Sequence, residues 1–158
     1  MRIIGIDPGL VHTGWAIIES EGNARHYVAS GVVLPPVKES LPVRLSFIFK
    51  GLGELIDLWK PDECAVEITF ANKNAASTLA LGHARAAAIV SASARGIPVF
   101  EYEPNKIKKA IACAGHADKD QVERMVRMLL PAAKPKTADE SDALAIALCH
   151  ANMNRFHF

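Results

Sequence analysis

Three apolar, strand-like segments follow one another at the start of the chain, and only short turns join them. They cover residues 2–7, 13–20 and 26–34. Neighbouring strands with such short connections pair antiparallel, because a parallel crossover needs roughly a dozen residues or more. The first part of the chain is therefore predicted to form an antiparallel meander of three strands.

The rest of the chain alternates between helical and strand-like patterns. Ser40 and Asn74 are candidate caps at the starts of two helices. Pro61 and Gly96 are expected to end these two helices. The predicted elements are a helix over 42–59, a strand over 63–68, a helix over 74–95, a strand over 97–102, a helix between Asp118 and Pro131, and a helix over 139–151. This order predicts an α/β domain with a mixed five-stranded sheet, in which three antiparallel strands precede parallel strands, flanked by helices.

Length and composition limit the classes of protein to consider. A chain of 158 residues suits one domain with a full core, so residues 1–158 are interpreted as a single domain. No apolar stretch is long enough to span a bilayer, and the N-terminus shows no cleavable signal pattern. Cys64, Cys113 and Cys149 have no zinc-like spacing and are expected to be reduced, buried thiols. We therefore expect a cytoplasmic protein without a membrane partner.

Four acidic residues lie at the edges of apolar segments. Asp7 ends the first strand, Glu67 lies in the fourth strand, and Asp139 and Asp142 open the last helix. A buried carboxylate is costly unless it is paired or binds a cation. Four carboxylates brought together would repel one another and would need divalent metal to stay ionised. The leading hypothesis is metal-dependent hydrolysis of phosphodiesters.

The helical pair has an alternative explanation. Asp139 and Asp142 are three residues apart, which places them on one helix face, but acids in a first helical turn are also common because the helix dipole favours them. Glu140 fits this second explanation and is expected to point elsewhere. The pair supports a metal site only together with Asp7 and Glu67.

The DPG turn after the first strand is compatible with another class of protein. Sugar kinases and actin-like ATPases also open with such a turn, in which glycines cradle a phosphate. Those folds need a second lobe, for which 158 residues are too few. A small-molecule phosphotransferase is therefore a distant alternative. In either case Gly14 is expected to let a neighbouring element approach closely.

A basic segment accompanies the acids, although the net charge of the whole chain is only +1. Residues 104–136 contain eight Lys or Arg and three Asp or Glu, which gives +5 in that segment. Lys108 and Lys119 are candidates to contact phosphates, and Phe70 could stack on an unpaired base. Solvent-exposed lysines and a core phenylalanine remain the alternatives.

Taken together, these segments resemble the RuvC-type Holliday-junction resolvases, a branch of the ribonuclease H-like nucleases. The resemblance extends over nearly the whole chain and rests on the segments IGIDPGLVHTGWA, LPVRL, AVEITFANKNAASTLALGHAR, HADKDQV and DESDALAIALCH. It implies a ribonuclease H-like fold and an endonuclease that resolves four-way DNA junctions by symmetric paired nicking in recombination and repair. It also implies a homodimer, with the helix over 74–95 at its interface, and a branch-migration motor as partner.

The resemblance also implies roles for particular residues. It makes Asp7, Glu67, Asp139 and Asp142 catalytic ligands of Mg2+ or Mn2+, with two ions per active site. The expected phosphate contacts are Lys108 and Lys119, of which Lys119 is also catalytic, and the expected aromatic contact near the junction is Phe70.

Some positions depart from the family pattern, but the four acids are intact. The departures are Leu10, Val11, Ile68 and Cys113. His12, His116 and His150 lack metal-ligand spacing and are treated as incidental. Among them, His150 is the best candidate to contact the metal ligands without binding the metal itself. Two rival functions stay open, which are a non-catalytic module that binds DNA junctions and a ribonuclease H-like nuclease with another nucleic-acid substrate.

Overall fold

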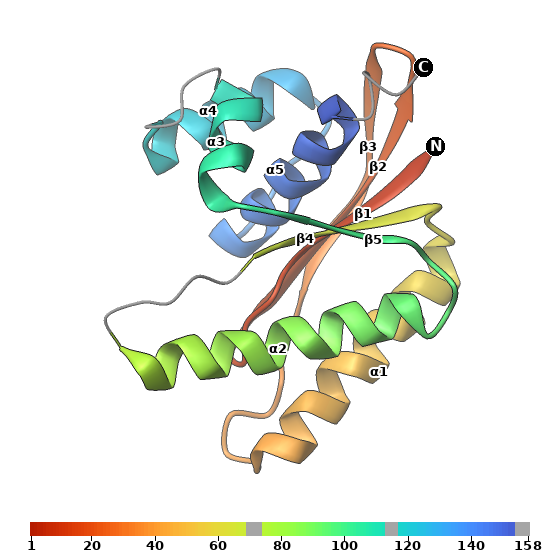
Figure 1. Cartoon of the computed structure of the whole chain (residues 1–158). Coiled ribbons are helices and arrows are strands. Elements are labelled where there is room, and N and C mark those ends of the chain that lie inside the picture. The colour runs from red at the N-terminus through yellow and green to blue at the C-terminus, as the bar shows by residue number, and fades with distance from the viewer. Residues whose placement is uncertain (69–73, 113–116, 154–158) are drawn as a thin grey trace.

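The computed structural model describes residues 1–68, 74–112 and 117–153, and Figure 1 shows their arrangement. One five-stranded sheet lies between two groups of helices. The strands are β1 (Arg2–Asp7), β2 (Thr13–Glu21), β3 (Ala24–Val33), β4 (Glu63–Glu67) and β5 (Val99–Tyr102). The helices are α1 (Leu41–Trp59), α2 (Ala75–Ser93), α3 (Pro104–Ala112), α4 (Lys119–Leu129) and α5 (Ala138–Met153). None of the described helices is long and apolar enough to cross a membrane.

The order of strands in the sheet is β3-β2-β1-β4-β5. β1, β2 and β3 pair antiparallel, as the short turns predict, and Gly22 adopts a positive φ of 56° in the turn between β2 and β3. β4 pairs parallel with β1, and β5 pairs parallel with β4, after the helical crossovers. The predicted mixed sheet is confirmed.

The two faces of the sheet carry different helices. α1 and α2 cover one face, and α3, α4 and α5 cover the other (Figure 1). Side chains of a strand alternate between faces. In β1, Ile4 and Ile6 therefore lie in the cluster with α1 and α2, while Ile3 lies in the cluster with α5.

Glycines let α5 lie unusually close to the sheet. A Cβ atom at Gly5 would overlap the backbone oxygen of Ala143, and one at Gly14 would overlap the backbone oxygen of Asp139. The close approach expected at Gly14 is therefore confirmed, and its partner is the first turn of α5. Nearly every residue of α5 from Glu140 to Ala151 is buried as a result.

Most helix ends agree with the predicted caps. The side chain of Asn74 accepts hydrogen bonds from the backbone of α2, and Asp118 and Gln121 form the expected capping box at α4. Ser40 stands at the N-cap of α1 as predicted, but its side chain makes no capping hydrogen bond. A proline at the start of α1 presets the helical backbone and removes one of the amides that a cap would satisfy.

One helix was not predicted. α3 has nine residues, and its two buried apolar side chains are Ile107 and Ile111. Two apolar residues four apart are too few to show a helical period. Pro104 at the first position was the available signal. The basic segment therefore begins with a helix that packs against α5 and α4.

Candidate active site

Two of the four candidate acids lie at neighbouring strand ends. β1 and β4 are adjacent and parallel, with Ile6 opposite Val66, so Asp7 and Glu67 end their strands at the same edge of the sheet. Asp7 is two residues beyond Gly5, which contacts α5, and strand alternation points it to the same face. Ala65 lies in the cluster with α5, and Glu67 follows it by two residues. Both carboxylates therefore face α5.

The other two acids come from the first turn of α5. The backbone of Asp139 lies against Gly14 of β2, which is paired with Asp7 in the sheet. Asp142 follows one turn later and lines a cavity together with Glu67. The structure therefore brings acids from three distant segments to one edge of the sheet, as the sequence predicts.

The four acids form one electrostatic group. Burial raises the pKa of Asp7 from its ordinary value to about 7, and the charges of Asp142, Glu67 and Asp139 add to this shift. Burial followed by the charge of Asp142 also raises the pKa of Glu67. The pKa of Asp142 is raised by burial and by Asp139, against the opposing effect of Lys119. A site with these properties favours cations.

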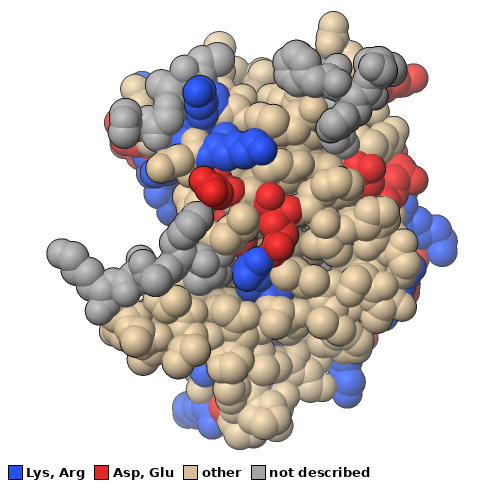
Figure 2. All heavy atoms as spheres, viewed as in Figure 1, with Lys and Arg blue, Asp and Glu red and all other residues tan. Residues whose placement is uncertain are grey.

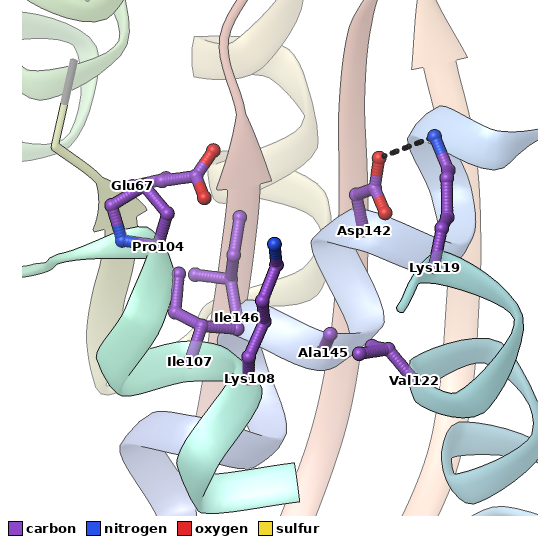
Figure 3. A pocket seen from close by; sticks show the side chains of 9 residues that line it. All are labelled: Glu67, Pro104, Ile107, Lys108, Lys119, Val122, Asp142, Ala145 and Ile146. Atoms are coloured by element: carbon purple, nitrogen blue, oxygen red, sulfur yellow. Dashed lines mark hydrogen bonds and ion pairs between the residues drawn. The ribbon is translucent and has the colours of Figure 1, made fainter. Parts of the chain in front are cut away.

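Two predicted lysines line the same cavity, which has a volume of about 380 Å³. Figure 3 shows the amino group of Lys108 on the side of Glu67, and Lys119 on the side of Asp142. The Lys119 Nζ atom lies 3.4 Å from Asp142 Oδ2, and its side chain is 65% exposed. The apolar part of the wall is formed by Pro104, Ile107, Val122, Ala145 and Ile146. Two of the eight basic residues of the predicted basic segment, Lys108 and Lys119, therefore line the acidic cavity.

The surface view shows the same juxtaposition. Acidic side chains gather near the centre of one face, with basic side chains directly beside them (Figure 2). This distribution can accept a cation at the centre and a polyanion around it.

The donor set suits a hard divalent cation. Carboxylate oxygens are the protein ligands that Mg2+ and Mn2+ prefer, and Mg2+ usually keeps several of its water molecules. Within the described ranges, no group of three or more Asp, Glu, His or Cys side chains lies close enough together to hold a metal ion. By chemical type, the carboxylates fit a hard divalent ion that keeps part of its own water.

Three residues named in the sequence analysis lie outside the described residues, namely Phe70, Cys113 and His116. Cys64 and Cys149 are buried, and burial raises the pKa of their thiols to about 12 and about 11. Both are small buried thiols, as expected. Glu140 points away from the cavity, toward Ser30 of β3.

Loop residues between β1 and β2 contribute contacts that the sequence analysis missed. His12 was treated as incidental, yet its Nδ1 lies 3.9 Å from Asp139 Oδ2. Thr13 Oγ1 donates to the backbone oxygen of Gly9 at 2.8 Å. Arg44 of the LPVRL segment donates to the backbone oxygen of Leu10 at 2.5 Å. Arg44 was the only one with a usable signal, because a charged residue there interrupts an amphipathic pattern.

His150 does not support the acidic site, which corrects the sequence interpretation. It is fully buried, and its Nδ1 and Nε2 atoms lie 2.6 Å from Tyr102 Oη and from Glu63 Oε2. Glu63 is at the opposite end of β4 from Glu67. Eight residues of helix, roughly 12 Å, separate His150 from Asp142. The histidine instead ties α5 to the far end of the sheet.

His150→Ala is therefore expected to lower stability and to leave catalysis intact. The change opens a cavity and leaves Tyr102 and Glu63 without this partner, at a cost of about 2–4 kcal/mol. Urea unfolding measures the loss, and nuclease rates measured well below the melting temperature should match wild type. A folded variant with a rate reduced tenfold or more would return His150 to the active site.

Comparisons with known proteins agree with this geometry. The family model for crossover junction endodeoxyribonuclease RuvC matches residues 3–150. A protein of that name from Methylobacterium radiotolerans is 50% identical over 157 residues, covering 99% of this chain and 76% of the relative. Its counterpart from Bradyrhizobium diazoefficiens is 52% identical over 152 residues, covering 96% of this chain and 87% of the relative.

Solved structures agree as well. The RuvC structure of Thermus thermophilus has a TM-score of 0.90 at 34% identity, with coverage of 99% of this chain and 97% of that one. The same relative in complex with a Holliday junction has a TM-score of 0.93 at 33% identity, covering 99% and 96%. A yeast mitochondrial Holliday junction resolvase shares the fold at 12% identity and a TM-score of 0.65. By sequence and by structure, the chain belongs to the RuvC family of crossover junction endodeoxyribonucleases.

Proposed function

We propose that this chain cleaves four-way DNA junctions by symmetric paired nicking, in homologous recombination and DNA repair. One observation carries the proposal: carboxylates from β1, β4 and α5 meet at one sheet edge, beside a cavity lined by two lysines. The family to which the chain belongs and the junction complex of the Thermus relative support the choice of substrate. Residues 1–158 would act as one ribonuclease H-like domain.

Asp7, Glu67, Asp139 and Asp142 would hold the divalent cations, Mg2+ or Mn2+, with two per active site. Bound there, the cations would activate a water molecule and stabilise charge on the departing 3′ oxygen. The charges of all three other acids raise the pKa of Asp7, so Asp7 interacts electrostatically with each of them. It is therefore the ligand whose loss should matter most.

The lysines would position the phosphodiester and offset its charge. Lys119 is the first residue of α4, directly after the N-cap Asp118, and its amino group reaches Asp142. Lys108 projects from α3 on the other side of the cavity (Figure 3). A phosphate between them would lie next to the carboxylates, so charge that develops on it would be stabilised by Lys119. Phe70 remains a proposed aromatic contact to DNA near the junction.

Lys119→Ala is expected to slow cleavage and to weaken the salt dependence of junction binding. Loss of the positively charged Lys119 side chain at the reacting phosphate should reduce the rate by roughly 10²-fold or more. Loss of one phosphate contact should lower the slope of log affinity against log salt by about 1. Single-turnover cleavage and binding titrations at several salt concentrations measure both effects.

Lys134→Ala is the matched control, because Lys134 is an exposed lysine of the same segment and does not line the cavity. Its cleavage rate should stay within a factor of about two of wild type, as is usual for exposed surface positions. Equal rates for the two variants would show that Lys119 is an ordinary surface lysine.

A homodimer would let two active sites act on opposite strands. The surface over α2 consists mostly of uncharged side chains in Figure 2, and Leu79 and Val90 of this helix are exposed. Alanines between them would allow close approach of a second α2. A branch-migration motor is the further partner implied by the family resemblance.

The substrate itself can be tested against the nearest rivals. Cleavage of a four-way junction, with an RNA–DNA hybrid of the same sequence left intact, is the result expected. Preference for the hybrid would assign the chain to another ribonuclease H-like activity. Tight junction binding without metal-dependent nicking would indicate a binding module.

A further inference from the structure

Glu140 lies between two candidate metal ligands but does not share their environment. It is in the first turn of α5, next to Asp139 and two residues before Asp142, and it is 7% exposed. Its side chain points to β3 and not into the acidic cavity. A carboxylate so deeply buried needs hydrogen-bond donors, and those donors identify its role.

The first donor is a residue of the sheet. Ser30 Oγ donates to Glu140 Oε2 at 2.8 Å, which joins β3 to α5 across 110 residues of sequence. Tyr27 Oη lies 3.1 Å from Ser30 Oγ. Because the single hydroxyl proton of Ser30 is used on Glu140, Tyr27 is the donor in that second bond. The result is a directed chain from Tyr27 through Ser30 to the carboxylate.

The second donor belongs to the start of α5. Thr137 Oγ1 lies 3.5 Å from Glu140 Oε1, and it accepts a hydrogen bond from the Glu140 backbone N–H at 3.2 Å. The Thr137 hydroxyl thus caps the backbone N–H of Glu140 in the first turn of α5. Glu140 therefore connects the cap of the helix to the sheet with one side chain.

A fixed attachment is needed at this point. Asp139 and Asp142 are in the same turn as Glu140 and face Asp7, so the repulsion among these carboxylates acts to move the turn away from the sheet. Gly14 allows the turn to lie against β2 but supplies no attractive side chain. Among the described contacts, the Ser30–Glu140 hydrogen bond is the polar side-chain link between this turn and a strand of the sheet, and His12 in the loop between β1 and β2 lies 3.9 Å from Asp139.

We propose that Glu140 is a positioning residue, which through Ser30 fixes the first turn of α5 so that Asp139 and Asp142 remain opposite Asp7. The proposal rests on the metal ligands named under the proposed function. It predicts that weakening the attachment raises the metal concentration needed for cleavage, because the loss of groups that orient metal ligands lowers metal affinity.

Comparing Glu140→Ala with Glu140→Gln distinguishes the effect of losing the hydrogen bonds from the effect of losing the negative charge. Alanine removes the hydrogen bonds, and the Mg2+ concentration for half-maximal junction cleavage should rise by roughly 10- to 100-fold, as for other groups that orient metal ligands. The Mg2+ concentration at which the ion begins to stabilise the protein against urea, which is measured without cleavage, should rise by the same factor. The rate at saturating Mg2+ should largely recover. Glutamine keeps an acceptor for Ser30 and a donor for Thr137 but loses the charge, and its Mg2+ requirement should stay near that of wild type.

Two further variants complete the test. Ser30→Ala should raise the Mg2+ requirement. Combining it with Glu140→Ala should add little, because both changes break the same Ser30–Glu140 hydrogen bond. Ile48→Val is the control for general destabilisation, since Ile48 is buried on the opposite face with α1. It should lower the melting temperature without changing the Mg2+ requirement.

The outcomes distinguish this proposal from the one on which it rests. An unchanged Mg2+ requirement in Glu140→Ala would overturn the positioning role, and so would equal behaviour of the Ala and Gln variants, which would make charge the cause. Asp142→Asn tests the ligand set separately. If that variant cleaves normally, the proposed metal site fails. If it is inactive while Glu140→Ala behaves as wild type, only the positioning role fails.

Discussion

Asp7→Asn is expected to abolish cleavage of four-way junctions and to leave their binding almost unchanged. The amide is close in size to the carboxylate but is a much weaker ligand for Mg2+. Asp7 interacts with the three other acids, so its loss disturbs the whole site. The rate should fall by more than about 10³-fold, beyond the loss that follows removal of a single neutral transition-state donor. Single-turnover cleavage and gel-shift binding measure the two effects.

Asp57→Asn makes the same chemical change far from the cavity. Asp57 lies on α1, and its exposed carboxylate pairs with Arg95. Exposed ion pairs contribute little to stability. This variant should cleave and bind as wild type does. Near-normal cleavage by purified Asp7→Asn protein would contradict the assignment of the active site.

Asp7→Asn should also stabilise the metal-free protein at neutral and alkaline pH. The pKa of Asp7 is raised from 3.8 to about 7 in the folded chain. Between these values the unfolded chain loses a proton that the folded chain keeps, so stability falls as pH rises through this window. Above it the penalty is complete and amounts to a few kcal/mol, since one pKa unit corresponds to about 1.4 kcal/mol. Asparagine carries no charge and avoids the penalty.

Urea unfolding in EDTA at several pH values measures this effect. Wild type and Asp7→Asn should be nearly equal at pH 4 and should diverge toward pH 8, where the variant is the more stable. Adding Mg2+ at pH 8 should stabilise wild type in proportion to the logarithm of ion concentration and should have little effect on the variant. Identical pH profiles for the two proteins would show that Asp7 is not held in a repulsive, buried site.

Local patterns were sufficient for the sheet and for two of the acids. Short turns determined the meander, and the positions of β1 and β4 placed Asp7 and Glu67 at one edge. Strand alternation, applied to Ile3 and Gly5, would also have assigned Asp7 to its face of the sheet. Asp139 and Asp142 could be placed there only through the family resemblance, because no local pattern states which edge a final helix covers.

The features of the site that could not be predicted from the sequence depend on contacts between distant residues. His12 meets Asp139, His150 meets Glu63, and Glu140 meets Ser30, each across more than eighty residues of sequence. No single element shows such pairs. α3 was missed for a different reason, because a nine-residue helix with two buried isoleucines has no visible period.

The most direct test of the central claim is a cleavage assay on synthetic immobile four-way junctions of several core sequences. Linear duplexes of the same arms are treated in parallel, with Mg2+ and with EDTA. We expect paired, symmetric, ligatable nicks on junctions only, and only with metal. Equal cutting of linear duplex, or cutting in EDTA, would contradict a metal-dependent junction resolvase. Junction binding without nicks at any of the core sequences would contradict the catalytic role of the acidic site.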